Sequence, residues 1–266
     1  MTRLVKRLAE LRTAGEGALV CFVTAGDPDL QTSTKIVLAL AQAGADVIEL
    51  GIPFSDPIAD GPSIQASSMR ALLAGTTVRG VLGLVREVRK TSDVPLVLMT
   101  YYNPVQRYGL EQFACDAANT GADGVILTDL TVEESGEWKK VAERHGLNTI
   151  FLLAPTSTDI RIRKVAKVAS GFVYCVSRTG VTGERTELAS GVSELVARIK
   201  ASTDLPVLVG FGVSKPEHVR EVCSYADGAV VGSALVNLIA EYGSSAELFS
   251  RLSKMVAELK AATKVK

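Results

Sequence analysis

Residues 46–63 read DVIELGIPFSDPIADGPS, and this stretch shows the unit from which the chain is built. Its first part, residues 47–52, is almost continuously apolar and has the length of a strand. A loop with Pro53, Pro57 and Gly61 follows, and a helical pattern begins near Pro62. Continuous apolar runs are typical of parallel strands that are buried on both faces. The stretch therefore predicts a strand, a tight loop and a helix.

Apolar runs of this kind recur along the chain, and helical patterns separate them. Amphipathic segments lie between the runs, two helices are expected in residues 62–92 around a break at Gly75, and further helices are expected in residues 3–12 and 246–262. Eight such units in 266 residues predict an α/β fold, a (β/α)₈ TIM barrel forming one domain over residues 1–266. A doubly wound open sheet is the alternative. The runs are residues 18–25, 46–52, 95–102, 124–130, 148–154, 171–177, 206–212 and 228–233.

Composition narrows the class of protein. Lys+Arg and Asp+Glu are balanced at 29 each, which argues against a nucleic-acid or acidic-membrane surface. The N-terminus has no apolar signal region, and no apolar run reaches the length of a membrane span. We therefore expect a soluble, cytoplasmic protein. The four cysteines form no C-x-x-C pair and are expected to be reduced core thiols.

Two carboxylates in the opening stretch are candidates for acid–base chemistry. Alternation along a strand places Glu49 on the face opposite Ile48 and Leu50, so Glu49 points into the barrel mouth if those two face the helices. An apolar surrounding would raise the pKa of Glu49. The other reading is a salt bridge at the strand end. Asp60 lies in a loop restricted by prolines, and its alternative role is to cap the following helix.

Glycine-rich turns follow the last two expected strands. Gly210-Phe211-Gly212 and Gly232-Ser233 fall where α/β barrels often bind phosphate, although tight turns also require glycine. Residues 177–186 are polar and glycine-hinged, and are expected to form a mobile lid. His145 and His218 lie in helical patterns and are expected to be solvated. No cluster has the spacing of a metal site, and no dinucleotide motif follows the first strand, so neither ligand is expected.

Six sequence strings give the chain its resemblance to a known family. They are FVTAGDPD (22–29), IELGIPFSDPIADGPSIQ (48–65), LMTYYNP (98–104), SRTGVTGERTEL (177–188), GFGVSKPEHV (210–219) and VVGSA (230–234). In this order and spacing, over essentially the whole length, the chain resembles the tryptophan synthase alpha subunit. The resemblance implies a lyase of tryptophan biosynthesis that cleaves indole-3-glycerol phosphate to indole and glyceraldehyde 3-phosphate by a retro-aldol reaction, without a cofactor.

The resemblance also implies roles for individual residues. Glu49 becomes the acid/base that protonates indole C3, and Asp60 becomes the carboxylate that meets the indole N–H. Thr182, in the lid, would meet Asp60 on closure. Backbone groups of the glycine loops and of the lid would bind the phosphate. The substrate-binding positions that carry over are Phe22, Thr100, Leu127, Tyr174, Thr182, Gly183, Phe211, Gly212, Gly232 and Ser233.

A partner is implied as well. The family assembles, as an alpha–beta heterotetramer, with a beta subunit that holds pyridoxal phosphate, and Asp56, Asn103 and Pro104 lie where the family meets it. This chain departs from the family at Thr128 and Thr131, where prolines are usual, so the loop after the fourth strand is expected to be less rigid. Three alternatives remain: a stand-alone indole-3-glycerol phosphate lyase, a binding subunit without chemistry of its own, and another phosphate-binding barrel enzyme such as a metal-dependent sugar-phosphate epimerase.

Overall fold

Eight parallel strands close into a barrel. The computed structural model of the chain describes residues 1–176, 191–210, 212–243 and 245–264. Each strand pairs with the next in sequence order, and β8 pairs with β1, so the predicted barrel is confirmed and the open sheet is excluded. The strands are β1 (Ala18–Thr24), β2 (Val47–Gly51), β3 (Leu96–Thr100), β4 (Gly124–Leu127), β5 (Asn148–Leu153), β6 (Val173–Val176), β7 (Val207–Gly210) and β8 (Gly228–Val231).

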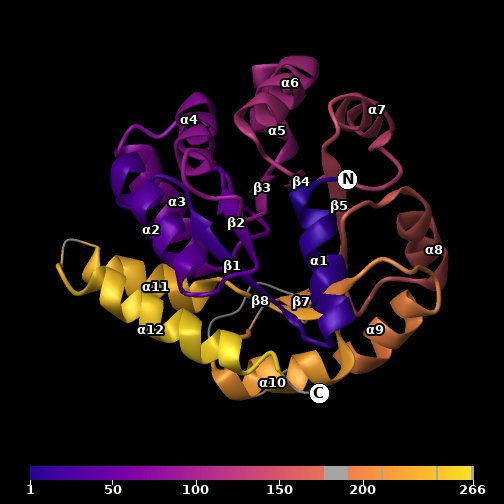
Figure 1. Cartoon of the computed structure of the whole chain (residues 1–266). Helices are drawn as coiled ribbons and strands as arrows, with labels where there is room; N and C mark the ends of the chain where they lie inside the picture. Colours follow the sequence, from indigo (N-terminus) through magenta and orange to yellow (C-terminus); the bar gives the residue numbers. More distant parts are fainter. Residues whose placement is uncertain (177–190, 211, 244, 265–266) are drawn as a thin grey trace.

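Helices surround this barrel (Figure 1). Two helices occupy the connection after β2, as its glycine break predicted, and two more follow β8. The connection after β3 also holds two helices, and the short α5 was not expected from the sequence, because the aromatic run at its start reads as strand. The helices are α1 (Arg3–Ala14), α2 (Leu30–Gln42), α3 (Pro62–Leu73), α4 (Val78–Arg89), α5 (Tyr102–Tyr108), α6 (Leu110–Thr120), α7 (Gly136–Arg144), α8 (Asp159–Val168), α9 (Val192–Lys200), α10 (Pro216–Tyr225), α11 (Ser233–Tyr242) and α12 (Leu248–Ala261).

The apolar residues form two separate clusters, one between the strands and the helices and one inside the barrel. Ile48 and Leu50 of β2 belong to the helix-facing cluster, whereas Val47 belongs to the interior cluster. This is the alternation of a strand buried on both faces. The interior cluster includes Leu4, Leu8, Leu11, Val20, Phe22, Val47, Val97, Met99, Ile126, Ile150, Tyr174, Leu208 and Val230.

At the N-terminal end of the barrel, the same pair of hydrogen bonds occurs at four strands. Asp46 accepts the Leu19 N–H at Oδ2 (2.8 Å) and donates its own N–H to the Leu19 carbonyl oxygen (2.9 Å). A residue one to three positions before every second strand thus fixes the start of the preceding strand. The same exchange joins Asp123 to Leu96, Ser170 to Thr149 and Asp227 to Val207.

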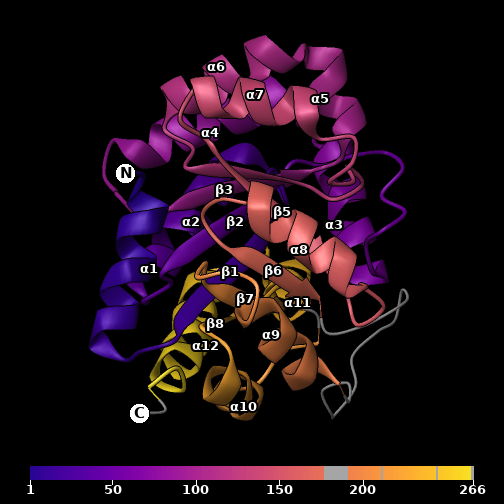
Figure 2. The ribbon, with the colours of Figure 1, turned by 90° about the vertical axis from the view of Figure 1, so that its right-hand side faces the viewer.

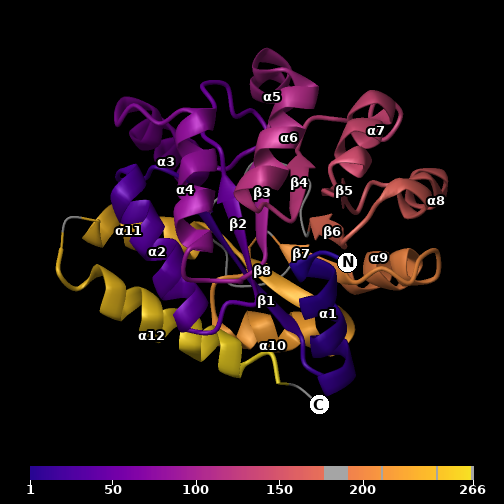
Figure 3. The same ribbon diagram turned by 45° about the horizontal axis from the view of Figure 1, so that its top comes forward.

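Cations then neutralise these aspartates and attach α1 to the barrel. Arg7 of α1 and Lys260 of α12 contact the Asp46 carboxylate at 2.7 and 2.8 Å, and Arg89 contacts Asp123 at 2.8 Å. Because α1 also places its leucines in the interior cluster, it closes this end. In Figure 2 α1 lies at one end of the barrel and the loop into α3 at the other, and Figure 3 shows α1 beside the starts of the strands. The open end is therefore the one where the strands finish.

Candidate active site

Glu49 is the acidic residue of β2, and its side chain points into the barrel. Its neighbours Ile48 and Leu50 face the helices, so Glu49 faces the interior, as the alternation predicted. Its side chain is fully buried, and both carboxyl oxygens lack a hydrogen-bond partner within the described part of the chain. A salt bridge at the strand end, the alternative reading, is therefore absent among the described residues.

Burial sets the protonation of Glu49. Removing a carboxylate from water disfavours its ionised form, and no cation among the described residues offsets this effect. Desolvation raises the pKa of Glu49 to about 8. At neutral pH the group is mostly the neutral acid, which suits it to give up a proton.

Asp60 lies in the β2–α3 loop, and it does not cap α3. The N-cap of that helix is Gly61, no side chain caps it, and Pro62 occupies the first turn. Gln65 instead fixes the loop from the helix side, because its Nε2 donates to the Asp60 carbonyl oxygen (2.8 Å). Desolvation raises the pKa of Asp60 to about 6, while a hydrogen bond from Tyr101 opposes that rise. The group is therefore mainly ionised at pH 7.

Tyr174 of β6 lies near both carboxyl groups. Burial raises its pKa well above the usual value, and the charges of Glu49 and Asp60 add to the rise. The adjacent strand makes room for this side chain, because a Cβ on Gly210 would lie 2.1 Å from the Tyr174 hydroxyl oxygen. The glycine at the end of β7 is thus required by the tyrosine. Tyr174 therefore lies within electrostatic range of both acids.

Phe22 also faces the interior, beside Glu49 in the strand register. The side chains of Leu127 and Thr100 do not face the barrel interior. Leu127 packs in the helix-facing cluster, and the Thr100 hydroxyl donates to the Ile52 carbonyl oxygen (3.3 Å). Their neighbours Ile126 and Met99 belong to the interior cluster. The side chains of β3 and β4 that face the interior are therefore one residue earlier than the positions that the resemblance suggested, which counting alternate residues back along each strand could have shown.

The glycine turns reach the same end of the barrel. Gly212 has φ 87°, a left-handed conformation that glycine adopts readily. Gly232 is the N-cap of α11, which begins at Ser233 without a side-chain cap, so its first backbone N–H groups face the turn. Gly232 also adjoins Phe22, since a Cβ there would lie 3.5 Å from that side chain. Thr182, Gly183, Phe211 and the expected lid lie outside the described residues.

The residues expected to meet a partner line the rim of this end. Asp56 and Asn103 are exposed, and Pro104 is half-buried. Asp129, in the loop after β4, accepts the Tyr102 N–H at 2.7 Å and so fixes the start of α5. The rim is also apolar in part, because Ile58 on the Asp60 loop is 78% exposed.

The two histidines are the other candidates for acid–base chemistry, and clusters of metal-binding side chains would be candidates for a metal site. His145 pairs with Glu111 on the surface (2.7 Å), but His218 is buried, and its Nδ1 accepts the Ser214 N–H (3.4 Å), so the expectation that it is solvated was wrong. No group of three metal-binding side chains occurs among the described residues. None of the helices in that part of the chain is long and apolar enough to cross a membrane.

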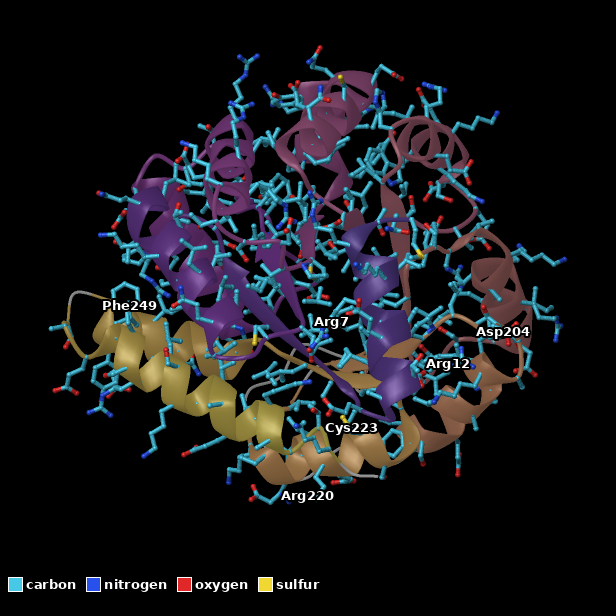
Figure 4. The ribbon with its side chains drawn as sticks, in the orientation of Figure 1. Arg7, Arg12, Asp204, Arg220, Cys223 and Phe249 are labelled. Atoms are coloured by element: carbon cyan, nitrogen blue, oxygen red, sulfur yellow. The ribbon has the colours of Figure 1, made fainter. Side chains whose placement is uncertain are left out.

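A small cavity of about 200 Å³ lies at the opposite, N-terminal end. Arg12, Asp204 and Cys223 are among its lining residues and are labelled in Figure 4. Burial raises the pKa of the Cys223 thiol to about 11, so the thiolate is scarce at neutral pH. Glu49 and Asp60, the candidate acid and base, lie at the other end.

Known proteins match this chain over nearly its whole length. The family model described as tryptophan synthase alpha chain matches residues 8–264. The tryptophan synthase alpha chain of Geotalea uraniireducens is 54% identical over 264 residues, covering 99% of this chain and 98% of that one. That of Geobacter sulfurreducens is 52% identical over 262 residues, with 98% and 99% covered.

Solved structures give the same result. A structure of Mycobacterium tuberculosis tryptophan synthase superposes with a TM-score of 0.92 at 38% identity, covering 100% of this chain and 99% of that one. Tryptophan synthase subunit alpha from Legionella pneumophila superposes with a TM-score of 0.89 at 38% identity, with 99% and 98% covered. With its barrel and its sequence in agreement, the chain belongs to the tryptophan synthase alpha chain family, the lyases that cleave indole-3-glycerol phosphate.

Proposed function

We propose that Glu49 and Asp60 divide the chemistry of indole-3-glycerol phosphate cleavage between them. The observation that carries this proposal is the difference in their surroundings. Glu49 is fully buried without a hydrogen-bond partner among the described residues, whereas Asp60 is only half-buried. Two carboxyls whose pKa values are separated in this way suit one acid and one base.

The reaction needs two proton transfers, and Glu49 takes part in both. Neutral Glu49 donates its proton to indole C3, which leaves an indolenine with positive charge at N1. The bond from C3 to the glycerol chain then breaks, its electrons return to the ring, and the adjacent hydroxyl becomes the aldehyde. The proton of that hydroxyl passes to the Glu49 carboxylate, which restores the acid. Ionised Asp60 stabilises the charge at N1 throughout.

The glycine turns suit the phosphate of the substrate. An uncapped helix start and a left-handed glycine present backbone N–H groups without side-chain obstruction. Gly212, Gly232 and Ser233 would supply these donors, and Thr182, Gly183 and Phe211 would complete the site. Phe22 and Tyr174, with Ile126 and Met99, would line the indole pocket.

The proposed partner is a tryptophan synthase beta subunit, which would hold the pyridoxal phosphate, so no cofactor is assigned to this chain. The exposed Asp56 and Asn103, with Pro104, would contribute to that interface. One of the solved structures that share this chain's fold is an aminoacrylate-bound form of M. tuberculosis tryptophan synthase. The alternative is a stand-alone lyase with the same site.

The test is the rate of indole formation from indole-3-glycerol phosphate as purified beta subunit is added. We expect a slow basal rate that rises and saturates with the beta subunit. A high rate that the beta subunit does not change would favour the stand-alone lyase. Absence of indole under both conditions would contradict the proposed activity and leave a binding subunit.

A further inference from the structure

Gly51 is the last residue of β2, and it lies two residues after Glu49. Because Ile48 and Leu50 face the helices, Gly51 shares the interior face of the strand with Glu49. Its backbone is that of a regular strand without a positive φ, so its conformation does not require glycine. Glycine weakens a strand, since it has no side chain to pack, and it often marks a close approach by another group. The space around Gly51, and not its backbone, therefore explains the glycine.

The aromatic ring of Phe22 fills that space. Phe22 is on the neighbouring β1, where it pairs with Glu49 in the strand register. A Cβ on Gly51 would lie 2.7 Å from the Phe22 Cζ and 3.0 Å from its Cε2. Carbon atoms that are not bonded prefer a separation of about 3.5–4.0 Å, so these distances leave no room for a side chain. The tip of the Phe22 ring thus lies directly on Gly51.

The base of the same ring lies beside the turn after β8. A Cβ on Gly232 would be 3.5 Å from both the Cβ and the Cδ1 of Phe22. A ring that is pushed off β2 has this turn on its other side, so it moves toward the barrel axis. Since Phe22 belongs to the interior cluster, its remaining 7% exposure opens into the mouth of the barrel. A side chain at residue 51 would therefore take space from the pocket beside Glu49.

We propose that Gly51 is a specificity-determining residue, which lets the Phe22 ring lie against β2 and so leaves the pocket wide enough for the two fused rings of indole. The inference rests on the proposed function, because that function assigns Phe22 to the wall of the indole pocket. The size of the ring that the pocket admits is then set from behind Phe22. A methyl group at residue 51 narrows the pocket for two-ring substrates and leaves the binding of the phosphate unchanged.

The experiment compares Gly51→Ala with a matched control and with a compensating variant. Gly83→Ala on α4 adds the same methyl group where it meets no other part of the chain within 4 Å. Phe22→Leu, alone and combined with Gly51→Ala, removes the two ring atoms that the new methyl group would contact. Folding is checked by circular dichroism and urea unfolding. If Gly51→Ala does not fold, the double variant should fold, and a double variant that is also unfolded would overturn the proposal.

The first measurement uses no ligand. In protein labelled with ring-¹³C phenylalanine, Phe22→Leu assigns the NMR signals of the Phe22 ring. Gly51→Ala is expected to shift these signals, since the tip of the ring must move by roughly 1 Å to restore a normal carbon contact. Gly83→Ala should leave them in place. Phe22 signals that do not change in folded Gly51→Ala would overturn the proposal.

The second measurement is the affinity for three phosphate esters, by isothermal titration calorimetry. Propyl phosphate, phenylpropyl phosphate and indolylpropyl phosphate carry no ring, one ring and two fused rings, and none of them can be cleaved. Gly51→Ala is expected to bind the indole ester at least about tenfold more weakly than wild type, because an apolar pocket discriminates by this order for one methyl group. The phenyl ester should lose less than about threefold, and propyl phosphate should bind equally well. Equal losses for all three esters would mean general damage to the site and would overturn the proposal.

The double variant tests whether the effect passes through Phe22. Its affinity for the indole ester should be at least about threefold higher than the product of the two single losses predicts, since residues in contact are not additive. Losses that simply multiply would overturn the proposal. A wild type that gains no affinity from either ring would instead contradict the proposed function, which places indole in this pocket. A wild type that prefers the indole ester, with the same preference in folded Gly51→Ala, would overturn the role of Gly51 alone.

Discussion

Replacing Glu49 by glutamine should change how the stability of the protein depends on pH. The folded protein holds the Glu49 proton up to a pKa of about 8, whereas the unfolded chain releases it near 4.5. Between these values the folded state binds more protons, so wild-type stability falls as pH rises. The separation of about 3.5 pH units, at about 1.36 kcal/mol each, corresponds to a loss of about 5 kcal/mol once pH exceeds 8.

Glutamine has no proton to lose, so the stability of Glu49→Gln does not fall with pH through this group. Urea unfolding of both proteins at pH 5 and at pH 8 measures the effect, and all other titrations cancel in the comparison. The variant should gain about 3.5 kcal/mol relative to wild type between the two pH values. Glu87→Gln is the control, because Glu87 is an exposed glutamate on α4 and should gain almost nothing. A difference between Glu49→Gln and wild type that does not change with pH would refute the buried neutral acid.

Three further predictions concern the same site and its support. The rate of indole formation should be bell-shaped in pH, with an acid limb near 6 from Asp60 and a basic limb near 8 from Glu49, and a flat profile of kcat between pH 5 and 9 would contradict it. Asp60→Asn should lower kcat more than about tenfold and leave the urea midpoint almost unchanged, because the residue lies in a loop and caps no helix; unchanged turnover would remove its role. Gly210→Ala should lower the free energy of unfolding in urea by about 1–3 kcal/mol and should reduce kcat, since the new Cβ would lie 2.1 Å from the Tyr174 hydroxyl oxygen. A variant with the wild-type stability and kcat would show that Tyr174 moves freely.

The sequence alone predicted the barrel and its order because its strands are continuous apolar runs, which do not depend on distant contacts. It also placed Glu49 in the interior, since Ile48 and Leu50 fix the alternation on β2. The short α5 was missed, because its seven residues have a proline in the first turn and follow another aromatic residue, Tyr101, so they carry almost no helical pattern. Leu127 was assigned to the pocket by resemblance, where the alternation on β4 favours Ile126.

Contacts between distant loops could not be read from the sequence. Tyr101 and Ala59 are 42 residues apart, and only the closed barrel brings the end of β3 to the loop after β2. The burial of His218 likewise depends on how α10 packs against β8. The balance between burial and hydrogen bonding that separates the pKa values of Glu49 and Asp60 is a property of the assembled site.

The central claim is that Glu49 supplies the proton for indole release. Its most direct test is the rate of indole formation from indole-3-glycerol phosphate by wild type and Glu49→Gln at pH 7, each with saturating beta subunit. We predict an active wild type and a variant slower by at least about a hundredfold, since general acid catalysis is lost while the shape of the pocket is kept. Equal rates from the two proteins would contradict the claim.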